Sequence, residues 1–376
     1  HTLLRRLATL EPVPVPAGEP GVAALGGRAT QKRLYVPVLS VYLDLRPSGA
    51  QGLGARPEAH PGRIFLDERL RQIERTFWPR GMAYEAVRAD GARIQMYLDT
   101  QVDVATAGVA LFVSESHHLF ETLTTAIPFE TEVTARALPN LFQLARLLDD
   151  KETAVIALAH TNAVRLFLVH QGGLRELHRL SEDPKLFHLV HGVNAMGQAH
   201  YQRHALAVGH TFAREAAERI ERLVERYGAH EVVLTGETRA VARLRQELSS
   251  HIASLLVTRP HTLEPDAPQG EVQNMVAPFL AQARVDRHRS LLDRLVEAVR
   301  SNGLGVVGLE RTRQALKQGQ GDILILMDDA SLAAETRDEL IALATKTYST
   351  TQIVEHDDLL ERLGGVGTLL RYPMTT

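Results

Sequence analysis

Short apolar runs alternate with helical segments along the whole chain, and this alternation restricts the fold to the α/β class. The runs "EVVLTG" (231–236) and "DILILMDD" (322–329) are typical of buried strands, and each lies beside a segment with charged residues at helical spacing. The stretch "TAVIALAHTNAVRLFLVHQGG" (153–173) contains two apolar strands around Thr161-Asn162 and predicts a β-hairpin. Elements of these two kinds pack as layers of helices against sheets.

The chain has 376 residues, which is more than one hydrophobic core usually takes, and we expect three α/β domains. Residues 1–148 form the predicted N-terminal domain, with strands over 35–46, 93–99, 108–115 and 119–127 and a helix over 64–77. Residues 149–262 form the central domain, with helices over 199–227 and 238–251. The segment "RPHTLEPDAPQG" (259–270) predicts a linker. Residues 271–376 form the C-terminal domain, which begins with a helix over 284–303.

Composition limits the partners that the protein can have. Lys and Arg total 42 against 45 Asp and Glu, so no global positive field attracts nucleic acid, and any such contact must be local. The absence of cysteine excludes disulfides, cysteine-ligated zinc and thiol catalysis. The first residues, "HTLLRRLATL", lack the apolar core of a signal peptide, and no window approaches 18 uninterrupted apolar residues. We expect a cytoplasmic protein without a membrane partner.

One glycine-rich motif raises a remote alternative, a dinucleotide-binding enzyme. "GLGVVG" (303–308) matches the pattern GxGxxG, and Asp328 follows about twenty residues later at the end of an apolar strand. The fingerprint has to follow a strand, however, and the preceding "SLLDRLVEAVRS" is charged and helically periodic. The pattern favours a helix end followed by a turn.

A group of histidines raises the alternative of a metal site. His200 and His204 are four residues apart and share a helical face, with His188, His191 and His210 nearby. "HYQRH" lacks the Glu that serves as general base in a metalloprotease motif, and no carboxylate lies between positions 183 and 215. We therefore predict no metal site and no cofactor. The same lack of negative charge favours a surface that faces phosphate.

Gly197 and Gln198 precede the long helix predicted over 199–227. Glycine permits close approach of another backbone, and the free N–H groups at a helix N-terminus can face an anion or a developing oxyanion. A glutamine side chain is not a useful general base, so catalysis here would work by positioning water and by hydrogen bonding. A simple glycine turn before a helix is the structural alternative.

The segment "AMGQAHYQRHALAVGHTFAREAAERIERL" (195–223) resembles the central domain of archaeal and eukaryotic class I release factors, in which a Gly-Gly-Gln tip precedes a basic and aromatic helix. "SVYLDL" (40–45), "GVVGLERTRQALKQGQGDILIL" (305–326) and "LGGVGTLLRY" (363–372) are similar to bacterial members of this superfamily. The resemblance implies a central ribonuclease-H-like domain and a C-terminal α/β/α sandwich like that of kink-turn-binding ribosomal proteins.

The resemblance also implies a function at the ribosomal A site. In the family, the glutamine loop enters the peptidyl transferase centre and promotes hydrolysis of the peptidyl-tRNA ester. Gly197 would then let the loop fit against rRNA, and Gln198 would place water and stabilise the oxyanion. The residues expected to contact rRNA or the tRNA acceptor end are His200, Tyr201, Arg203 and His204. The implied partners are the ribosome, through rRNA and peptidyl-tRNA, and a translational GTPase.

Two departures from the family pattern narrow this function. Met196 stands where the first glycine of the tip belongs, and the N-terminal domain has no codon-reading motif. Hydrolysis in the rescue of stalled ribosomes needs no stop-codon decoding and is the first expectation. The alternative is a non-catalytic factor that recognises stalled ribosomes or acts in hibernation, as Pelota- and Balon-like members bind the A site without cutting the ester.

Overall fold

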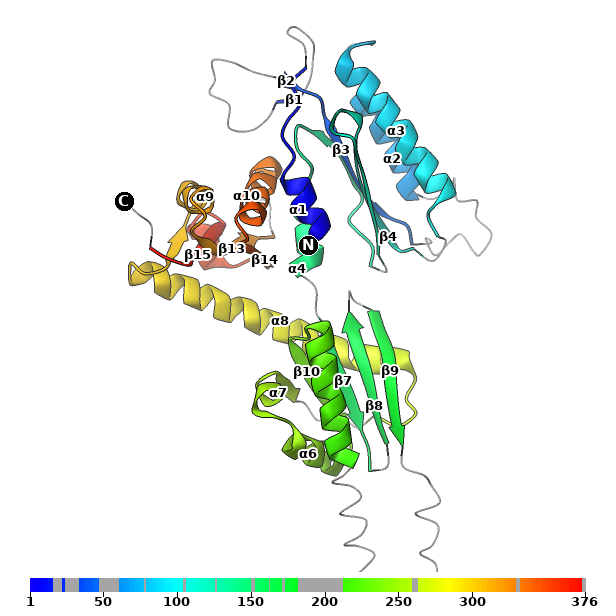
Figure 1. Cartoon of the computed structure of the whole chain (residues 1–376), viewed down its shortest axis with the longest axis vertical. Coiled ribbons are helices and arrows are strands. Elements are labelled where there is room, and N and C mark those ends of the chain that lie inside the picture. The colour runs from blue at the N-terminus through cyan, green and yellow to red at the C-terminus, as the bar shows by residue number, and fades with distance from the viewer. Residues whose placement is uncertain are drawn as a thin grey trace, which may run out of the picture. The chain divides into compact units, whose positions relative to one another are not determined.

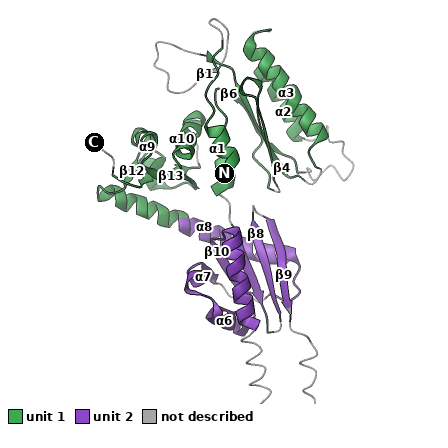
Figure 2. Ribbon diagram, in the orientation of Figure 1, with its two compact units in different colours: residues 1–150, 288–376 green, residues 151–287 purple. Residues whose placement is uncertain are grey.

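Helices and strands alternate along the chain in the computed structural model, which confirms the predicted α/β class (Figure 1). The structure describes residues 1–15, 22–23, 34–46, 61–77, 79–103, 106–125, 127–149, 153–161, 163–170, 173–181, 212–258, 263–328 and 332–373. They form two units: unit 1 combines residues 1–150 with residues 288–376, and unit 2 is residues 151–287 (Figure 2). Among the described helices, none is long and apolar enough to cross a membrane.

The first sheet of unit 1 is antiparallel, in the order β5-β4-β3-β6. Its strands are β3 (Val38–Asp44), β4 (Gly108–Ser114), β5 (Leu119–Thr125) and β6 (Glu132–Arg136). Residues alternate along β3, so that Leu39, Val41 and Leu43 pack against helix α2 (Pro61–Glu74) and helix α3 (Met82–Thr100). Val38 and Tyr42 belong to the core on the other face, with helices α1 (Thr2–Ala8) and α4 (Phe142–Asp149). Strands β1 (Val22–Ala23) and β2 (Leu34–Tyr35) form a separate pair.

The predicted strand over 93–99 is wrong, because these residues lie inside helix α3. The apolar residues of "RIQMYLD" have no consistent period of two. Over the whole helix, in contrast, the buried positions recur at helical spacing, as Ala83, Val87, Ile94 and Leu98 show. Asp90 is a fully buried polar residue on this otherwise apolar face, and the sequence pattern did not predict its role. Its carboxylate accepts the Glu115 N–H at 3.0 Å and thereby fixes the short η2 helix (Glu115–His117).

Unit 2 contains one mixed sheet in the order β11-β10-β7-β8-β9. The predicted hairpin is confirmed as β7 (Ala154–Ala159) and β8 (Ala163–His170), and β9 (Gly173–Ser181) extends it into an antiparallel meander. Strands β10 (Glu231–Gly236) and β11 (Leu256–Thr258) continue from β7 in parallel. This order agrees with the ribonuclease-H-like fold that the resemblance implies.

Helices cover both faces of this sheet. A helix over 212–227, α6 (Thr238–Glu247) and α7 (Ser250–Ser254) share one core with Val155, Leu166 and Leu234. The first half of α8 (Gln269–Arg300) covers the other face through Val272, Val276 and Leu280. The helix predicted over 238–251 is divided in two, because Leu248 is extended and the Ser249 hydroxyl accepts the Ile252 N–H to begin α7.

Arg165 explains how the predicted linker is held. Its guanidinium is almost fully buried, pairs with the Glu176 carboxylate at 2.5 Å, and donates to the carbonyls of Pro265 and Ala267 at 3.2 and 2.7 Å. Residues 263–268 therefore lie against the sheet, and helix α8 begins fifteen residues before the predicted start at 284.

We predict that Arg165→Met lowers the free energy of unfolding of unit 2 by about 3 kcal/mol, because the change leaves the Pro265 and Ala267 carbonyls without their donor and removes the buried partner of the Glu176 carboxylate. Arg179→Met is the matched control. Its side chain is half-exposed and also pairs with Glu176, so its loss should cost only ~0.5 kcal/mol. Urea denaturation of both variants measures the difference, and equal values would contradict the prediction.

The remaining part of unit 1 is a three-layer α/β/α sandwich, as predicted. Its sheet has the order β12-β15-β13-β14, with β12 (Gly305–Val307), β13 (Gly321–Met327), β14 (Thr350–Val354) and β15 (Val366–Leu370). Helices α9 (Leu309–Lys317) and α10 (Ala334–Lys346) cover one face. The second half of α8 and helix α11 (Asp358–Arg362) cover the other face through Leu291, Leu295 and Leu360. The three larger sheets lie within the three proposed domains, whose exact boundaries stay a prediction.

The "GLGVVG" motif packs strand β12 against a helix. Helix α8 precedes Gly303, so the strand that a dinucleotide fingerprint must follow is not there in this fully described segment. A Cβ at Gly305 would lie 2.8 Å from the Cβ of Ala298 in α8. Close packing of β12 on α8 therefore accounts for the glycine, and the dinucleotide alternative loses its structural basis.

Candidate functional site

The residues predicted to form the catalytic loop lie outside the described part of the chain. This applies to Met196, to the proposed catalytic pair Gly197 and Gln198, and to the proposed RNA contacts His200, Tyr201, Arg203 and His204. It also applies to His188, His191 and His210. The structure does describe the two elements between which this segment is connected, strand β9, which ends at Ser181, and the helix over 212–227.

Both elements belong to the carboxyl edge of the parallel strands of unit 2. Ser181 pairs with Ala163, immediately after the turn that joins β7 to β8, and Ala159 at the end of β7 pairs with Gly236 at the end of β10. The helix over 212–227 returns to the start of β10 through only residues 228–230, so its N-terminus lies toward the same edge. Ligands of α/β sheets bind at this edge.

Two loops at this edge are tied together by Glu237. Its carboxylate accepts the backbone N–H of Thr161 at 3.1 Å and also the Thr161 hydroxyl, while its own N–H donates to the Ala159 carbonyl at 2.8 Å. These hydrogen bonds, chiefly that from the Thr161 hydroxyl, lower the pKa of Glu237, so that the carboxylate is ionised at neutral pH. The β7–β8 turn and the β10–α6 junction therefore act as one rigid support.

Gly236 makes this close approach of the two loops sterically feasible. Its φ is +115°, which side chains rarely tolerate, and a Cβ at this position would lie 2.1 Å from the Ala159 carbonyl oxygen. The sequence showed only a glycine after an apolar strand, and the need for it became visible once the partner strand was placed.

Besides these hydrogen bonds, His160 and Arg239 also lower the pKa of Glu237. The Nε2 atom of His160 is buried and has no hydrogen-bond partner among the described residues. The edge thus combines a fixed backbone with a few polar groups, and it offers a scaffold rather than a complete catalytic set of its own.

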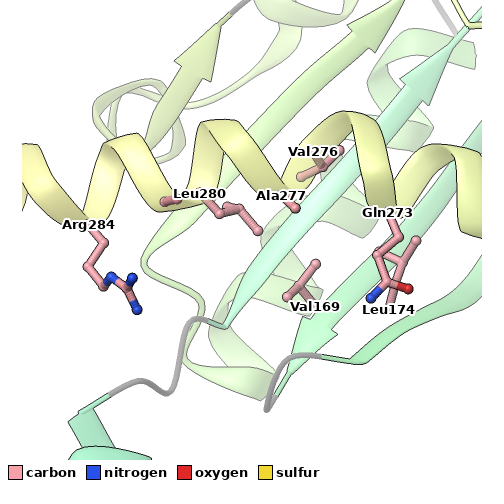
Figure 3. A pocket seen from close by; sticks show the side chains of 8 residues that line it. Val169, Leu174, Gln273, Val276, Ala277, Leu280 and Arg284 are labelled. Carbon is pink, nitrogen blue, oxygen red and sulfur yellow. The ribbon is translucent and has the colours of Figure 1, made fainter. Parts of the chain in front are cut away.

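An apolar cavity of about 140 Å³ lies elsewhere in unit 2, between β8, β9 and the first half of α8 (Figure 3). Most of its lining side chains are aliphatic, with Gln273 and Arg284 as the polar members. It lies at the other end of the β8–β9 pair from Ser181, since Val169 pairs with Leu174 there. Its lining therefore contributes nothing to the carboxyl edge.

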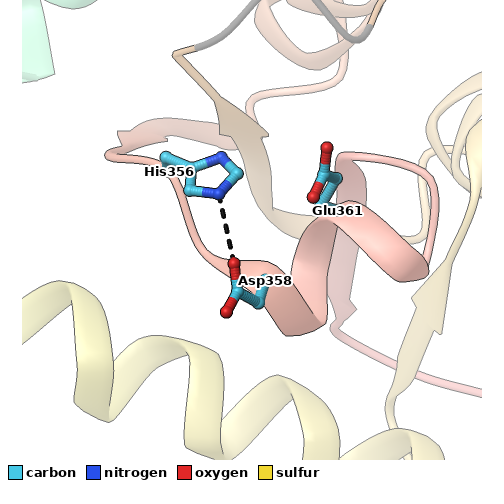
Figure 4. A group of neighbouring side chains, drawn as sticks. All are labelled: His356, Asp358 and Glu361. Carbon is cyan, nitrogen blue, oxygen red and sulfur yellow. Dashed lines mark hydrogen bonds and ion pairs between the residues drawn. The ribbon is translucent and has the colours of Figure 1, made fainter.

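His356, Asp358 and Glu361 form a second polar group, in and before α11 (Figure 4). Their ligand atoms lie within 4.8 Å of one another, and His356 Nε2 is 3.2 Å from Asp358 Oδ1. This trio was not predicted from the sequence, although the spacing H-x-D-x-x-E is a signal that could have indicated it. All three side chains are exposed, and exposed acidic groups commonly gather without an ion, so we assign no ion to them.

Comparisons with known proteins match the part of the chain that contains unit 2. The family model "Bacterial archaeo-eukaryotic release factor family 2" matches residues 153–300, which cover β7 through the end of α8. A protein pelota homolog of Pyrococcus furiosus is 27% identical over 174 residues, which are 43% of this chain and 48% of the relative. A protein pelota homolog of Methanocaldococcus jannaschii is 31% identical over 99 residues, 25% of this chain and 28% of the relative.

These matches confirm that the chain is related to the archaeo-eukaryotic release factor superfamily. Within that superfamily, the matching family model is that of bacterial family 2, over the central segment. The matched region spans about half the length of the first relative and about a quarter of the second. The structure of Saccharomyces cerevisiae Dom34, described as a translation termination-like factor, aligns with a TM-score of 0.46 at 11% identity, over 72% of this chain and 80% of that chain.

Proposed function

We propose that the protein is a ribosome-binding translation factor that enters the A site and promotes peptidyl-tRNA hydrolysis in ribosome rescue, without decoding a stop codon. The observation that supports this function is the family match over residues 153–300. This range includes Gly197 and Gln198, which we propose to be the counterpart of the release-factor tip. The proposed partners are rRNA and peptidyl-tRNA, with a translational GTPase as a further partner. The proposed location is the cytoplasm.

The proposed chemistry is an attack of water on the ester carbonyl carbon. The bond to the tRNA 3′-oxygen breaks, so that the products are a peptide carboxylate and a free 3′-hydroxyl. Gln198 cannot remove a proton effectively, and it contributes by positioning the water and by stabilising the oxyanion through its backbone N–H. Gly197 lets the backbone approach the RNA, and His200, Tyr201, Arg203 and His204 contact the acceptor end or rRNA.

The carboxyl edge of unit 2 is a suitable support for a loop that positions water. The segment that carries Gln198 begins next to Ser181, beside the turn that Glu237 fixes through Thr161. A loop that must place a water molecule within a fraction of an ångström needs rigid ends, because small displacements of a positioned group are costly to catalysis. The edge supplies that rigidity through main-chain hydrogen bonds.

Met196 supports a second candidate, a factor that occupies the A site without hydrolysis. A side chain at the position of the first glycine of the tip restricts both the loop conformation and its approach to RNA. Such a protein would recognise stalled ribosomes or protect idle ones in hibernation. Both candidates require binding to the ribosome, and they differ only in peptide release.

Sedimentation with ribosomes tests the shared requirement. We expect the purified protein to co-sediment with stalled ribosomes at about 0.15 M salt, where weak surface contacts are screened. Gln198→Ala should sediment equally well, since both candidates place binding in the surrounding RNA contacts. Absence of the wild-type protein from every ribosomal fraction would exclude both candidates.

A further inference from the structure

Helix α4 is continuous with the N-terminal part of the chain but packs into the C-terminal sandwich of the same unit. Leu141 and Leu144 share one buried core with Leu340 and Ile341 of α10 and with Ile353 of β14. Tyr42 and Phe112 of the first sheet belong to that core as well. Residues nearly two hundred positions apart in sequence therefore form a single apolar interior.

Asp338 of α10 holds the N-terminus of α4. Its Oδ1 atom accepts the backbone N–H groups of Leu141 and Phe142 at 2.8 and 3.1 Å, which would otherwise lack an acceptor within the helix. Its Oδ2 atom accepts from Nη1 of Arg136 at 2.6 Å. The side chain of Asp338 is only 7% exposed, so its carboxylate is largely shielded from bulk water.

Two further contacts hold the rest of α4 in the same way. The Asp149 carboxylate, at the end of the helix, accepts the Ile353 N–H of β14 at 2.5 Å. Arg146 pairs with Asp328, which follows β13, at 3.3 Å. The helix is thus bonded to the C-terminal sandwich at its start, in its middle and at its end.

We propose that α4, capped by Asp338, is a coupling device that makes residues 1–149 and 288–373 one cooperative body, so that a displacement of α10 is transmitted to the N-terminal sheet. A partner that binds the C-terminal sandwich would then alter the N-terminal sheet without touching it. This inference is independent of the proposed function, since it concerns unit 1 alone.

The charges around Asp338 make this coupling sensitive to pH. The groups that face it are Arg136 and Glu132 on β6, Tyr42 on β3 and the N–H groups of α4, and Glu335 on α10 contacts Arg136. Burial raises the pKa of Asp338 to about 7, and Glu132 adds to this, whereas Arg136 and the α4 N–H groups lower it. A pKa above the unfolded value of about 3.9 means that protonation favours the folded unit. This contribution is complete below about pH 4 and is lost as the pH rises through about 7.

Hydrogen exchange of the full-length protein tests the coupling. In Asp338→Ala we expect the amides of residues 145–149 and of Ile353, which Asp338 does not touch, to exchange at least tenfold faster, while strands β7 and β8 of unit 2 stay unchanged. Glu335→Gln is the matched control on the same helix; it is half-exposed, lies 3.7 Å from Arg136, and should change exchange less than twofold. Faster exchange confined to α10 would overturn the proposal.

Two further measurements test the coupling even if Asp338→Ala does not fold. Asp338→Asn retains an acceptor oxygen, and we expect it to remove the pH dependence of α4 opening between pH 5 and 8 that the wild-type protein shows. In the wild-type protein, the rates of hydrogen exchange in β3 and in β14 should rise at the same urea concentrations. A β14 that opens at lower urea than β3 would show two independent bodies and refute the coupling.

Discussion

Replacing Gln198 with alanine is expected to lower the rate of peptide release from stalled ribosomes by about a hundredfold or more, a loss typical of removing one positioned group that stabilises an oxyanion. Binding should not change, because the proposed RNA contacts lie outside the tip. Single-turnover release from purified stalled complexes, with the factor in excess, separates the chemical step from binding. The result would show that the chain acts as a hydrolase in spite of its incomplete tip.

Gln202→Ala is the matched control, since it removes the same side chain four residues later in the sequence and should leave release within about twofold. Met196→Gly restores the first glycine of the tip, so it tests whether Met196 limits peptide release. Faster release by this variant would mean that Met196 restrains a competent loop. If the wild-type protein and Gln198→Ala both bind ribosomes and neither releases peptide, the hydrolase is excluded and the non-catalytic factor remains.

Replacing Gly236 with alanine is expected to lower the free energy of unfolding of unit 2 by about 3 kcal/mol or more, at the upper end of single substitutions. The new Cβ would lie 2.1 Å from the Ala159 carbonyl oxygen, and a φ of +115° is strained for any side chain. Relief requires β10 and β7 to separate at the edge, which breaks the bond between the Glu237 N–H and the Ala159 carbonyl.

Gly228→Ala provides the control for the backbone effect alone. Gly228 also has a positive φ, +61°, but nothing lies within 4 Å of the position that a Cβ would take. We expect this variant to lose only about 1 kcal/mol. Urea denaturation followed by hydrogen exchange in β7 and β10 compares the two, and similar losses would show that crowding at the edge is not the cause.

Patterns within short stretches of the sequence predicted those parts of the fold that depend on residues close together in the sequence. The hairpin β7–β8 and the buried strands β10 and β13 were visible as apolar runs, because each is buried on both faces. Residues 93–99 were misassigned since a window of seven residues is too short to show the helical period of α3. The early start of α8 was missed because its position depends on Arg165, a hundred residues away.

The candidate site shows the same division. Glycine and glutamine before a predicted basic helix can be recognised in the sequence, and the family resemblance implies a role for them. Glu237 and Thr161, in contrast, are ordinary residues in the sequence, and only the pairing of β7 with β10 brings them together. Asp338 is likewise one acidic residue on an amphipathic helix until α4 is placed against it.

The division of unit 1 into two stretches of sequence has a consequence for synthesis. Unit 2 is completed once residue 287 has left the ribosome, but the core shared by Tyr42, Leu144 and Leu340 needs residues that are translated after unit 2. Until then the apolar face formed by α1, α4 and the first sheet lacks its partners in α10 and β14, and such surfaces are prone to aggregate or to bind chaperones. A nascent chain that stops before α10 would therefore combine a folded unit 2 with an N-terminal part whose apolar face is exposed.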